Sequence, residues 1–426
     1  MRREVIRWTA AVLCTAVFGL ATAGEAQPAG QGAESKGPLA SLPSKPGPHV
    51  EKIKALGDGQ WLSLGKPVPD PKWGAAPGRA FTCKMAAAPD LGGAFLYGEG
   101  EHGGTTRRGD VEYYNDDLFF YDLNAHAWVC CHPGTPVKGP KLKFDPKLKC
   151  EVNDNGEPLP VAVMIHGYAD TAYSSKRKLF AGLPNGSYFY WGKDLGRRRE
   201  SKNVEEMHKQ GPWLYDAAGG KWELRLKSGG PKPEYGGVLE FVQRGGQELL
   251  FRYVRDGAVW LYDLDKREWS EAKPKGPRPP WGIEPNACYD TKRNRIYMGG
   301  GQYPEAKDTN ALWAYDIKDN GLIDLKARDS KLRLYATWGA VMTYDSVNDK
   351  VVLMRSNPSG GGPVGIFVYD PETNAWSDSQ PFPKEVAWQK VNGFYSAELN
   401  AHVYHSAGDS VRDGVIHVYR LKAAAK

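Results

Sequence analysis

Val259-Trp260-Leu261-Tyr262-Asp263, followed by Trp269, is the stretch of sequence that decides the fold. An apolar run ends here in a Tyr-Asp pair, and a tryptophan stands seven residues after the tyrosine. The same pattern recurs along the chain, with one leucine in place of the tryptophan. Its positions are Tyr121 with Trp128, Tyr215 with Trp222, Tyr262 with Trp269, Tyr315 with Leu322 and Tyr369 with Trp376. A fixed offset repeated in this way indicates an internal structural repeat.

A β-hairpin signal precedes each Tyr-Asp pair. In one example, residues 287–290 and 295–298 are strand-like, a polar turn joins them, and Gly299-Gly300-Gly301 follows. Successive tyrosines lie 94, 47, 53 and 54 residues apart, so the period is about fifty. A sheet of four short strands cannot bury both of its faces alone, and repeats of this kind therefore stack around an axis. The sequence predicts an all-β propeller.

The last repeat, residues 392–421, supports a count of six blades. Its third strand ends at Tyr419, and the chain finishes seven residues later. Gln60-Trp61-Leu62-Ser63-Leu64 resembles the outer strand Glu268-Trp269-Ser270, so we expect this N-terminal strand to complete the last blade and remove an open edge. The alternative is seven blades, with a degenerate one between residues 132 and 160. We favour two insertions in the long interval, a basic loop over 133–160 and a charged stretch over 193–210.

The N-terminal residues are typical of an export signal. Arg2, Arg3 and Arg7 precede a short apolar run that ends at Ala21-Thr22-Ala23, a small-residue cleavage pattern. A twin-arginine signal over residues 2–7 is the alternative to an ordinary one. The expected organisation is a signal peptide over 1–23, a flexible linker over 24–55 and a propeller over 56–426. We expect a secreted or periplasmic protein with no integral membrane segment after signal removal.

Charge and cysteine content narrow the choice of partners. The formal net charge of +6 falls to about +4 without the signal, which argues against nucleic-acid binding. Signal removal leaves an odd number of cysteines, so at least one thiol is free or intermolecular. They are Cys83, Cys130, Cys131, Cys150 and Cys288. We expect Cys130 or Cys131 to bridge Cys150, and Cys83 and Cys288 to remain unlinked because they lie on opposite sides of the ring.

The chain resembles kelch-repeat propellers over nearly all of its mature length. The resemblance rests on the glycines after the second strand, the Tyr-Asp pair and the tryptophan at its fixed offset. It implies the galactose-oxidase-like propeller fold. It does not imply one function, because such propellers serve as enzymes, sugar binders and interaction modules. Exported six-bladed members include a sialic acid mutarotase, similar to this chain in architecture and export alone.

Candidate ligand-binding residues occupy one mouth of the central channel. Propellers bind ligands at loops where second strands end and inner strands begin. The residues at those positions are His102, Tyr168, Arg252, Arg255, Glu284, Tyr303, Trp338 and Arg355. Aromatic faces stack on sugar rings, and arginines hold carboxylate or sulfate in a bidentate manner. We expect these arginines to meet an anionic group of the ligand and to contribute little to stability.

Three local motifs contribute less to the functional prediction. Tyr404-His405 resembles the copper-binding pair of galactose-oxidase-like enzymes, but it falls on a second strand, and we interpret it as a core-facing tyrosine beside a channel or turn histidine. Glu101-His102, with Asp110 and Glu112, is interpreted as a solvated loop. The lysines of residues 141–149 form a basic loop of the same kind. We therefore predict no metal site, and the sequence identifies no cofactor.

Three functions remain open. The first is binding of a carbohydrate or acidic glycan at the channel mouth. The second is a carbohydrate-active enzyme, such as a mutarotase, epimerase or lyase acting on an acidic sugar. The third is a scaffold for a protein partner. The sequence does not decide between enzyme and binder.

Overall fold

The structure is a computed structural model of the chain. It describes residues 37–79, 82–98, 105–114, 116–134, 136, 143–148, 150–152, 155–156, 158, 167–182, 212–224, 230–231, 236–254, 257–279, 285–300, 312–328, 340–356, 364–377, 380, 382–383, 390–407 and 414–423. They belong to one compact unit, Lys36–Lys426. The predicted signal peptide lies outside them. No helix of the described part is long and apolar enough to span a membrane.

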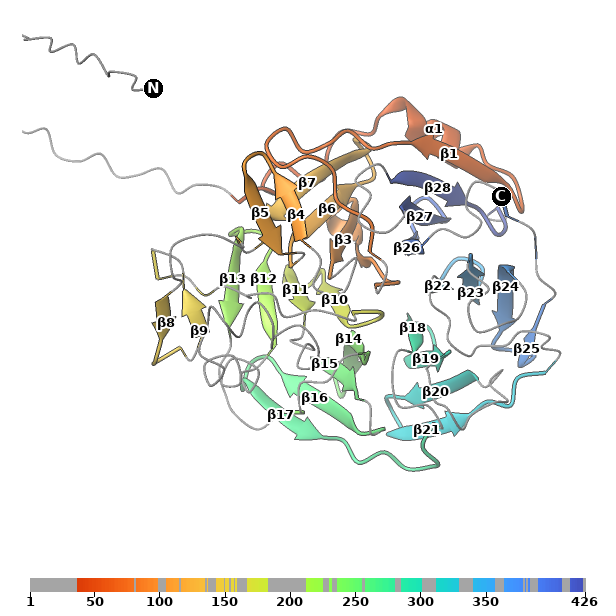
Figure 1. The fold of residues 1–426 in the computed structure, drawn as a ribbon. Helices are drawn as coiled ribbons and strands as arrows, with labels where there is room; N and C mark the ends of the chain where they lie inside the picture. Colours follow the sequence, from red (N-terminus) through yellow and green to blue (C-terminus); the bar gives the residue numbers. More distant parts are fainter. Residues whose placement is uncertain are drawn as a thin grey trace, which may run out of the picture. The chain divides into compact units, whose positions relative to one another are not determined.

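Six four-stranded antiparallel sheets form the blades of a propeller (Figure 1). Blade 1 contains β2 (Ala86–Ala88), β3 (Gly93–Tyr97), β6 (Leu118–Asp122) and β7 (Ala127–His132). Blade 2 contains β10 (Thr171–Ser174), β11 (Leu179–Gly182), β12 (Trp213–Asp216) and β13 (Lys221–Leu224). Blade 3 contains β14 (Val238–Arg244), β15 (Gln247–Tyr253), β16 (Val259–Asp263) and β17 (Glu268–Glu271). The six-bladed all-β fold is confirmed.

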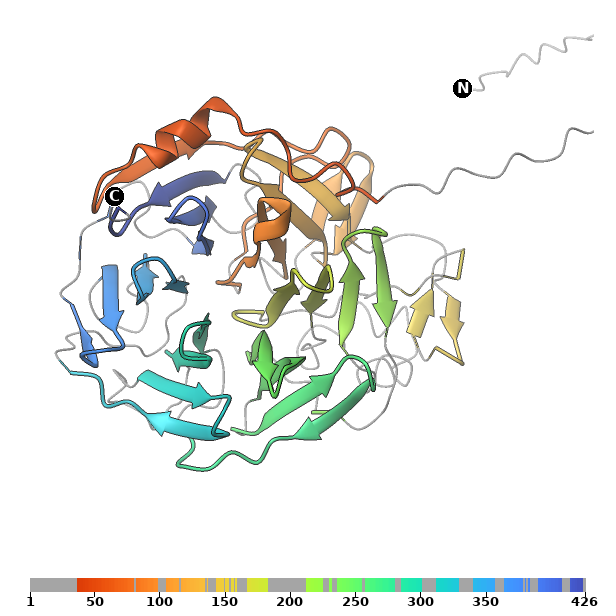
Figure 2. The same cartoon turned by 180° about the vertical axis from the view of Figure 1, so that it is seen from behind.

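The other three blades follow around the ring, with their inner strands near the axis and their outer strands at the rim (Figures 1 and 2). Blade 4 contains β18 (Asn286–Asp290), β19 (Arg295–Gly299), β20 (Leu312–Asp316) and β21 (Gly321–Asp324). Blade 5 contains β22 (Ala340–Asp345), β23 (Lys350–Arg355), β24 (Gly365–Asp370) and β25 (Ala375–Trp376). Blade 6 contains β26 (Lys390–Ser396), β27 (Ala401–Ala407), β28 (Val415–Tyr419) and β1 (Trp61–Gly65).

The N-terminal strand closes the ring as expected. β1 pairs with β28 and places Trp61 directly opposite Tyr419, with ring centroids 4.8 Å apart. Within the other blades, the tyrosine of each repeat faces the tryptophan of the fourth strand, or Leu322 in blade 4, for example Tyr262 and Trp269 at 5.0 Å. The repeated pair is therefore a contact between the third and fourth strands of a blade, and in blade 6 its two members come from opposite ends of the chain.

A second repeated interaction, which the sequence analysis missed, is a side-chain hydrogen bond within the tight turns. A strand tyrosine donates a hydrogen bond to the side chain five residues later, as Tyr315 does to Asn320 (2.7 Å) and Tyr369 to Asn374 (2.8 Å). Asn320 and Asn374 adopt left-handed backbone angles, φ 52° and 53°, which asparagine tolerates better than most residues. Their amides donate to the preceding blade, Asn320 to the carbonyl of Ala272 and Asn374 to that of Leu325. The turns thus join neighbouring blades.

The described insertions are small hairpins rather than a seventh blade. Between residues 133 and 160 the chain forms β8 (Lys143–Asp145) and β9 (Cys150–Val152), a sheet of two strands. Blade 1 carries another hairpin, β4 (Thr105–Arg108) and β5 (Val111–Tyr114), and the short 3-10 turn η1 (Pro89–Leu91). The charged stretch over 193–210 lies outside the described residues.

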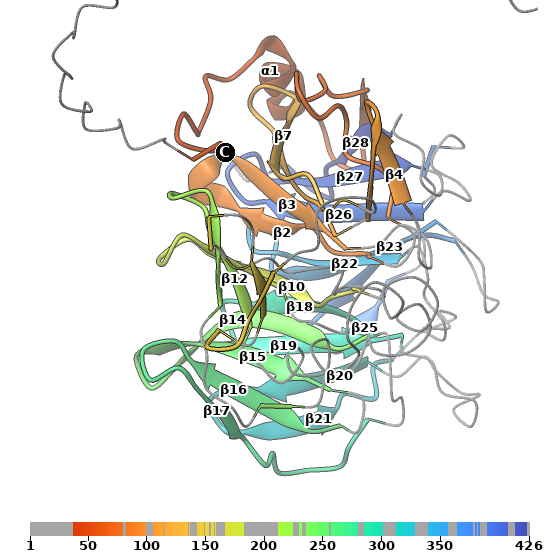
Figure 3. The ribbon, with the colours of Figure 1, turned by 60° about the vertical axis from the view of Figure 1, so that its left-hand side comes forward.

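The predicted linker needs a correction over its described part. Residues 48–54 form α1 (Pro48–Lys54), which lies on the rim beside β28 (Figures 1 and 3). Val50 and Ile53 of this helix are fully buried in the core shared by blades 1 and 6. Arg420 donates hydrogen bonds to the carbonyls of Ile53 and Lys54. Residues 37–55 therefore pack against the propeller, because two apolar side chains one helical turn apart outweigh the polar composition that indicated a linker.

The expected disulfide is also wrong. Cys130 and Cys131 are free thiols, and as successive residues of β7 they point to opposite faces of the blade. Burial raises the pKa of both thiols. Cys83 and Cys288 are free as well, so the prediction that they do not form a bridge is confirmed.

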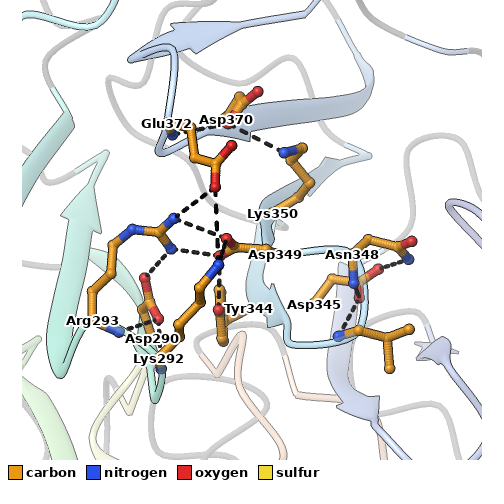
Figure 4. Close-up of polar contacts among 11 residues, drawn as sticks. Asp290, Lys292, Arg293, Tyr344, Asp345, Asn348, Asp349, Lys350, Asp370 and Glu372 are labelled. Carbon is orange, nitrogen blue, oxygen red and sulfur yellow. Dashed lines mark hydrogen bonds and ion pairs between the residues drawn. The ribbon is translucent and has the colours of Figure 1, made fainter.

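Charged side chains gather where blades 4 and 5 present their tight turns (Figure 4). Arg293 of the β18–β19 turn contacts Asp349 of the β22–β23 turn at 2.5 Å, and Lys292 contacts the same carboxylate at 2.5 Å. Hydrogen bonds from Arg293 are the largest cause that holds the pKa of Asp349 well below its ordinary value. The Asp349 side chain is only 16% exposed, whereas Glu372, 3.9 Å from both cations, is 66% exposed. Asp349 is the centre of this cluster.

The first prediction concerns ring closure. Deleting residues 1–66 should give an insoluble chain or one without a cooperative unfolding transition, because β28 becomes an open edge and Tyr419 loses Trp61. Deleting residues 1–35 is the matched control, since it leaves α1 and β1 in place. Thermal unfolding followed by circular dichroism compares the two. If both deletions melt alike, the closure by β1 does not stabilise the ring.

The second prediction concerns Asp349. Asp349→Asn should lower the free energy of unfolding by about 1–2 kcal/mol at pH 7, and Glu372→Gln should change it little. A carboxylate with a depressed folded pKa stabilises fully above its unfolded pKa of about 4 and loses this contribution as the pH falls toward the folded value. The difference between Asp349→Asn and the parent should therefore shrink below about pH 4. Urea unfolding across this range measures it, and a constant difference down to pH 2 would contradict the assignment.

Candidate binding face

We call the face where second strands end and inner strands begin the mouth face, and the opposite one the turn face. Of the predicted ligand-binding residues, Tyr168, Arg252 and Arg355 are described, and all three lie at the mouth face of their blades. They are at most 1% exposed. The other five predicted residues, His102, Arg255, Glu284, Tyr303 and Trp338, lie outside the described residues.

Arg252 is held by a carboxylate that sequence reasoning overlooked. Asp170, directly before β10, accepts a hydrogen bond from Arg252 at 3.0 Å and another from the backbone of Gly237 at 3.1 Å. Both side chains of the ion pair are almost completely buried, 2% and 0% exposed. Tyr168 stands two residues before Asp170, and its backbone carbonyl accepts from the amides of Cys83 and Lys84. Arg355 ends β23 in blade 5, and its burial lowers its pKa.

A second buried ion-pair cluster lies in blade 1. Asp117, directly before β6, accepts from Arg79 at 2.7 Å and from Arg108 of the β4–β5 hairpin at 2.5 Å. The Arg79 and Asp117 side chains are 0% and 1% exposed. Burial raises the pKa of the neighbouring Tyr97 strongly, and Asp116 and Asp117 raise it further. The mouth face therefore carries fully buried charges in more than one blade.

Tyr404 matches its interpretation as a core residue, and His405 is also fully buried. Tyr404 is buried in the core between blades 5 and 6. His405 points the other way along β27, and its ring lies 5.2 Å from that of Trp128. Burial is the main reason that the pKa of His405 falls to about 3, and the nearby charges of Arg79 and His417 add to it. No group of three metal-ligating side chains occurs among the described residues.

An ion pair joins the segment before β2 of blade 1 to the inner strand of blade 3. Lys84 of blade 1 donates to Glu240 of blade 3 at 2.5 Å and to the carbonyl of Leu239 at 3.1 Å. Burial raises the pKa of Glu240, and Lys84 opposes that rise. The cavity beside this pair measures about 170 Å³ and is lined by inner-strand residues such as Tyr173 and Tyr289. It is too small for a sugar, since ligand pockets usually measure ~300–1,000 Å³.

A larger cavity of about 960 Å³ lies between blades 5 and 6, lined by β24, β25, the β22–β23 turn and residues 421–423. At other junctions, the segment that leaves one blade pairs with the outer strand of the next blade. Val68 pairs with Ala127, Lys275 with Gly321 and Arg328 with Ala375, each adding a parallel bridge to the outer strand of the next blade. Within the described residues no such bridge joins blade 5 to β1. This cavity is far from the predicted residues, and its ion pair Lys350–Asp370 is already matched, so we do not assign the ligand site to it.

Comparisons with known proteins do not identify a family. No family model matches the chain. A segment is 31% identical over 83 residues to Dynein regulatory complex subunit 7 of Chlamydomonas reinhardtii, which covers 18% of this chain and 7% of that protein. The match is too short in both proteins to show a shared family.

The third prediction tests the Arg252–Asp170 pair. Breaking a buried ion pair leaves an unpaired buried charge, so Arg252→Met should lower the free energy of unfolding by about 3–5 kcal/mol. The expectation that Arg252 contributes little to stability is therefore revised. The double variant Arg252→Met/Asp170→Asn should recover part of the loss, because Asn keeps an acceptor for Gly237 without the charge. Chemical unfolding of both variants measures this, and an unchanged single variant would show that the pair is not formed.

Proposed function

We propose that this chain is a kelch-type propeller that binds an acidic carbohydrate at its mouth face. Six blades in a repeat of about fifty residues, five of them with a Tyr-Asp pair and four with a tryptophan seven residues after the tyrosine, support the kelch assignment. The predicted signal peptide supports an exported protein that meets extracellular or envelope glycans. A propeller suits this role because its rigid blades hold loops from many parts of the chain around one site.

The observation that carries the proposal is the burial of three arginines at the mouth face. Arg79, Arg252 and Arg355 belong to blades 1, 3 and 5 and are among the largest fully buried side chains of the protein. Arginine is seldom fully buried, because its charge loses hydration. Ion pairs hold Arg79 and Arg252 in fixed positions. Arginines fixed in this way are suited to bidentate recognition of a carboxylate or sulfate.

Binding fits these contacts better than catalysis does. A general acid or base needs a carboxylate that gives up and takes up a proton near neutral pH. Asp117 and Asp170 are instead engaged by the guanidinium groups of Arg79 and Arg252 at hydrogen-bonding distance, so they serve to hold these arginines. The Lys84–Glu240 pair joins blade 1 to the inner strand of blade 3, so the ligand rests at the mouth. A carbohydrate-active enzyme would need its acid and base among the remaining residues of the mouth.

The fourth prediction is that the protein binds uronic or sialic acid glycans and not their neutral counterparts, with an affinity that falls as salt rises. Arg355→Lys keeps the positive charge but removes the paired donors of the planar guanidinium, so it should weaken binding by about tenfold. Arg295→Lys is the matched control, because Arg295 begins its second strand at the turn face and pairs with Asp316.

A glycan array followed by calorimetry measures these affinities, and a parallel assay follows turnover of the same sugars. Equal affinity for neutral and acidic glycans, or equal loss in the two variants, would contradict the proposal. Turnover of the acidic sugar would replace it with the enzymatic alternative.

A further inference from the structure

Two charged or titratable side chains at the junction of blades 6 and 1 have polar atoms without hydrogen-bond partners among the described residues. Arg79 uses Nη2 on Asp117, but within the described part of the chain its Nε and Nη1 have no hydrogen-bond partner. The same holds for both ring nitrogens of His405. The side chain of Arg79 and the whole of His405 are 0% exposed. A buried donor without a partner costs about 1–3 kcal/mol, and more when it is charged.

These atoms belong to one cluster. Asn392 is the cross-strand partner of His405, and its amide donates to the carbonyls of Arg79 (3.2 Å) and Thr82. The remaining polar atoms here, Oδ1 of Asn392 and Oγ1 of Thr82, are also unpartnered among the described residues. Three segments far apart in the sequence, before β2, in β26 and in β27, therefore bring unsatisfied polar groups to one place.

The local charge around His405 is positive. The charged groups whose interaction with this imidazole is resolved are Arg79, from the segment before β2, and His417 of β28. Asp117, the carboxylate bonded to Arg79, is shared with Arg108. Trp128 and Asn392, the other neighbours of His405, carry no charge. Donors in a positive environment call for a negatively charged acceptor.

The backbone at Gly414 forms one wall of this cluster. A Cβ added at Gly414 would lie 2.0 Å from Nε2 of His405, so only glycine allows the imidazole to keep its place. A side chain here would move the ring away from Arg79. The absence of a Cβ leaves room for the imidazole.

We propose that the blade 6–blade 1 junction binds a carboxylate-sized anion, held by one free donor of Arg79, Nε or Nη1, and by the imidazole of His405. A charge-assisted hydrogen bond from the guanidinium and one from the imidazole can each meet one oxygen of the carboxylate. If this anion is the acidic group of the sugar, the inference identifies where that group binds and rests on the proposed function. Binding of a simple carboxylate at the junction stands independently.

Anion binding should be linked to proton uptake. In the free protein His405 is neutral at pH 7, since its pKa is about 3. A bound anion beside the ring offsets the charges of Arg79 and His417 and favours the imidazolium form, which donates from both nitrogens. Affinity should therefore rise as the pH falls from 7 to 5, by up to about tenfold for each unit.

The fifth prediction is tested on the full-length protein with acetate, sulfate and glucuronate as probes. Histidine NMR resonances report the protonation of His405, and calorimetry reports affinity at pH 5, 6 and 7. His405→Gln and Arg79→Lys should each weaken acetate binding by at least about tenfold. His402→Gln is the matched control, because His402 is equally buried on β27 but contacts Thr343 (2.9 Å) and Asp345 (3.4 Å).

The outcomes separate the two proposals. Acetate and glucuronate that both shift the His405 resonances support both. Acetate that shifts them while no acidic sugar binds supports the anion site and contradicts the proposed function. Acidic sugar that binds without moving the His405 resonances, while acetate has no effect, overturns the anion site alone and means that water satisfies these atoms. The wild-type resonances decide the question even where a variant fails to fold.

Discussion

The contact between a tyrosine on the third strand and a large apolar residue on the fourth is the interaction on which the rest of the molecule depends. Tyr262 and Trp269 make it within one blade, and each blade repeats it. It attaches the outermost strand, which has one neighbour in its own sheet. In blade 6, Trp61 and Tyr419 make the same contact between the two ends of the chain, so the device that completes a blade also closes the ring.

The two faces of the propeller differ in how their polar groups are satisfied. At the turn face, strand tyrosines, left-handed asparagines and the Asp349 cluster bind one another and the neighbouring blades. At the mouth face, several buried groups are only partly satisfied, most clearly Arg79 and His405. A stable turn face can offset the cost of leaving donors unpaired at the mouth. The burial of Arg79, Arg252 and Arg355 is what directs the functional proposal to the mouth face.

Sequence position identified the arginines and not the groups that hold them. Arg252 and Arg355 were found because they end second strands, a position that the repeat defines. Asp117 and Asp170 were missed because they stand just before a strand, where an aspartate is usually a turn residue. Their partners lie 38 and 82 residues away, and no local pattern joins them. The role of Arg79 likewise depends on its place beside His405 and Asn392, from the opposite end of the chain.

The sequence by itself determined the fold class, the number of blades and the closure by the strand around Trp61. These follow from spacing that repeats about every fifty residues, because identical blades make identical local contacts. Tertiary structure alone decided that residues 37–55 pack on the rim, that Cys130 and Cys131 stay free, and that the mouth arginines are buried, with Arg79 and Arg252 in ion pairs. Each of these depends on which segments meet around the ring. A contact between residues far apart in the chain produces no repeating pattern in either segment. Only the folded propeller therefore shows it.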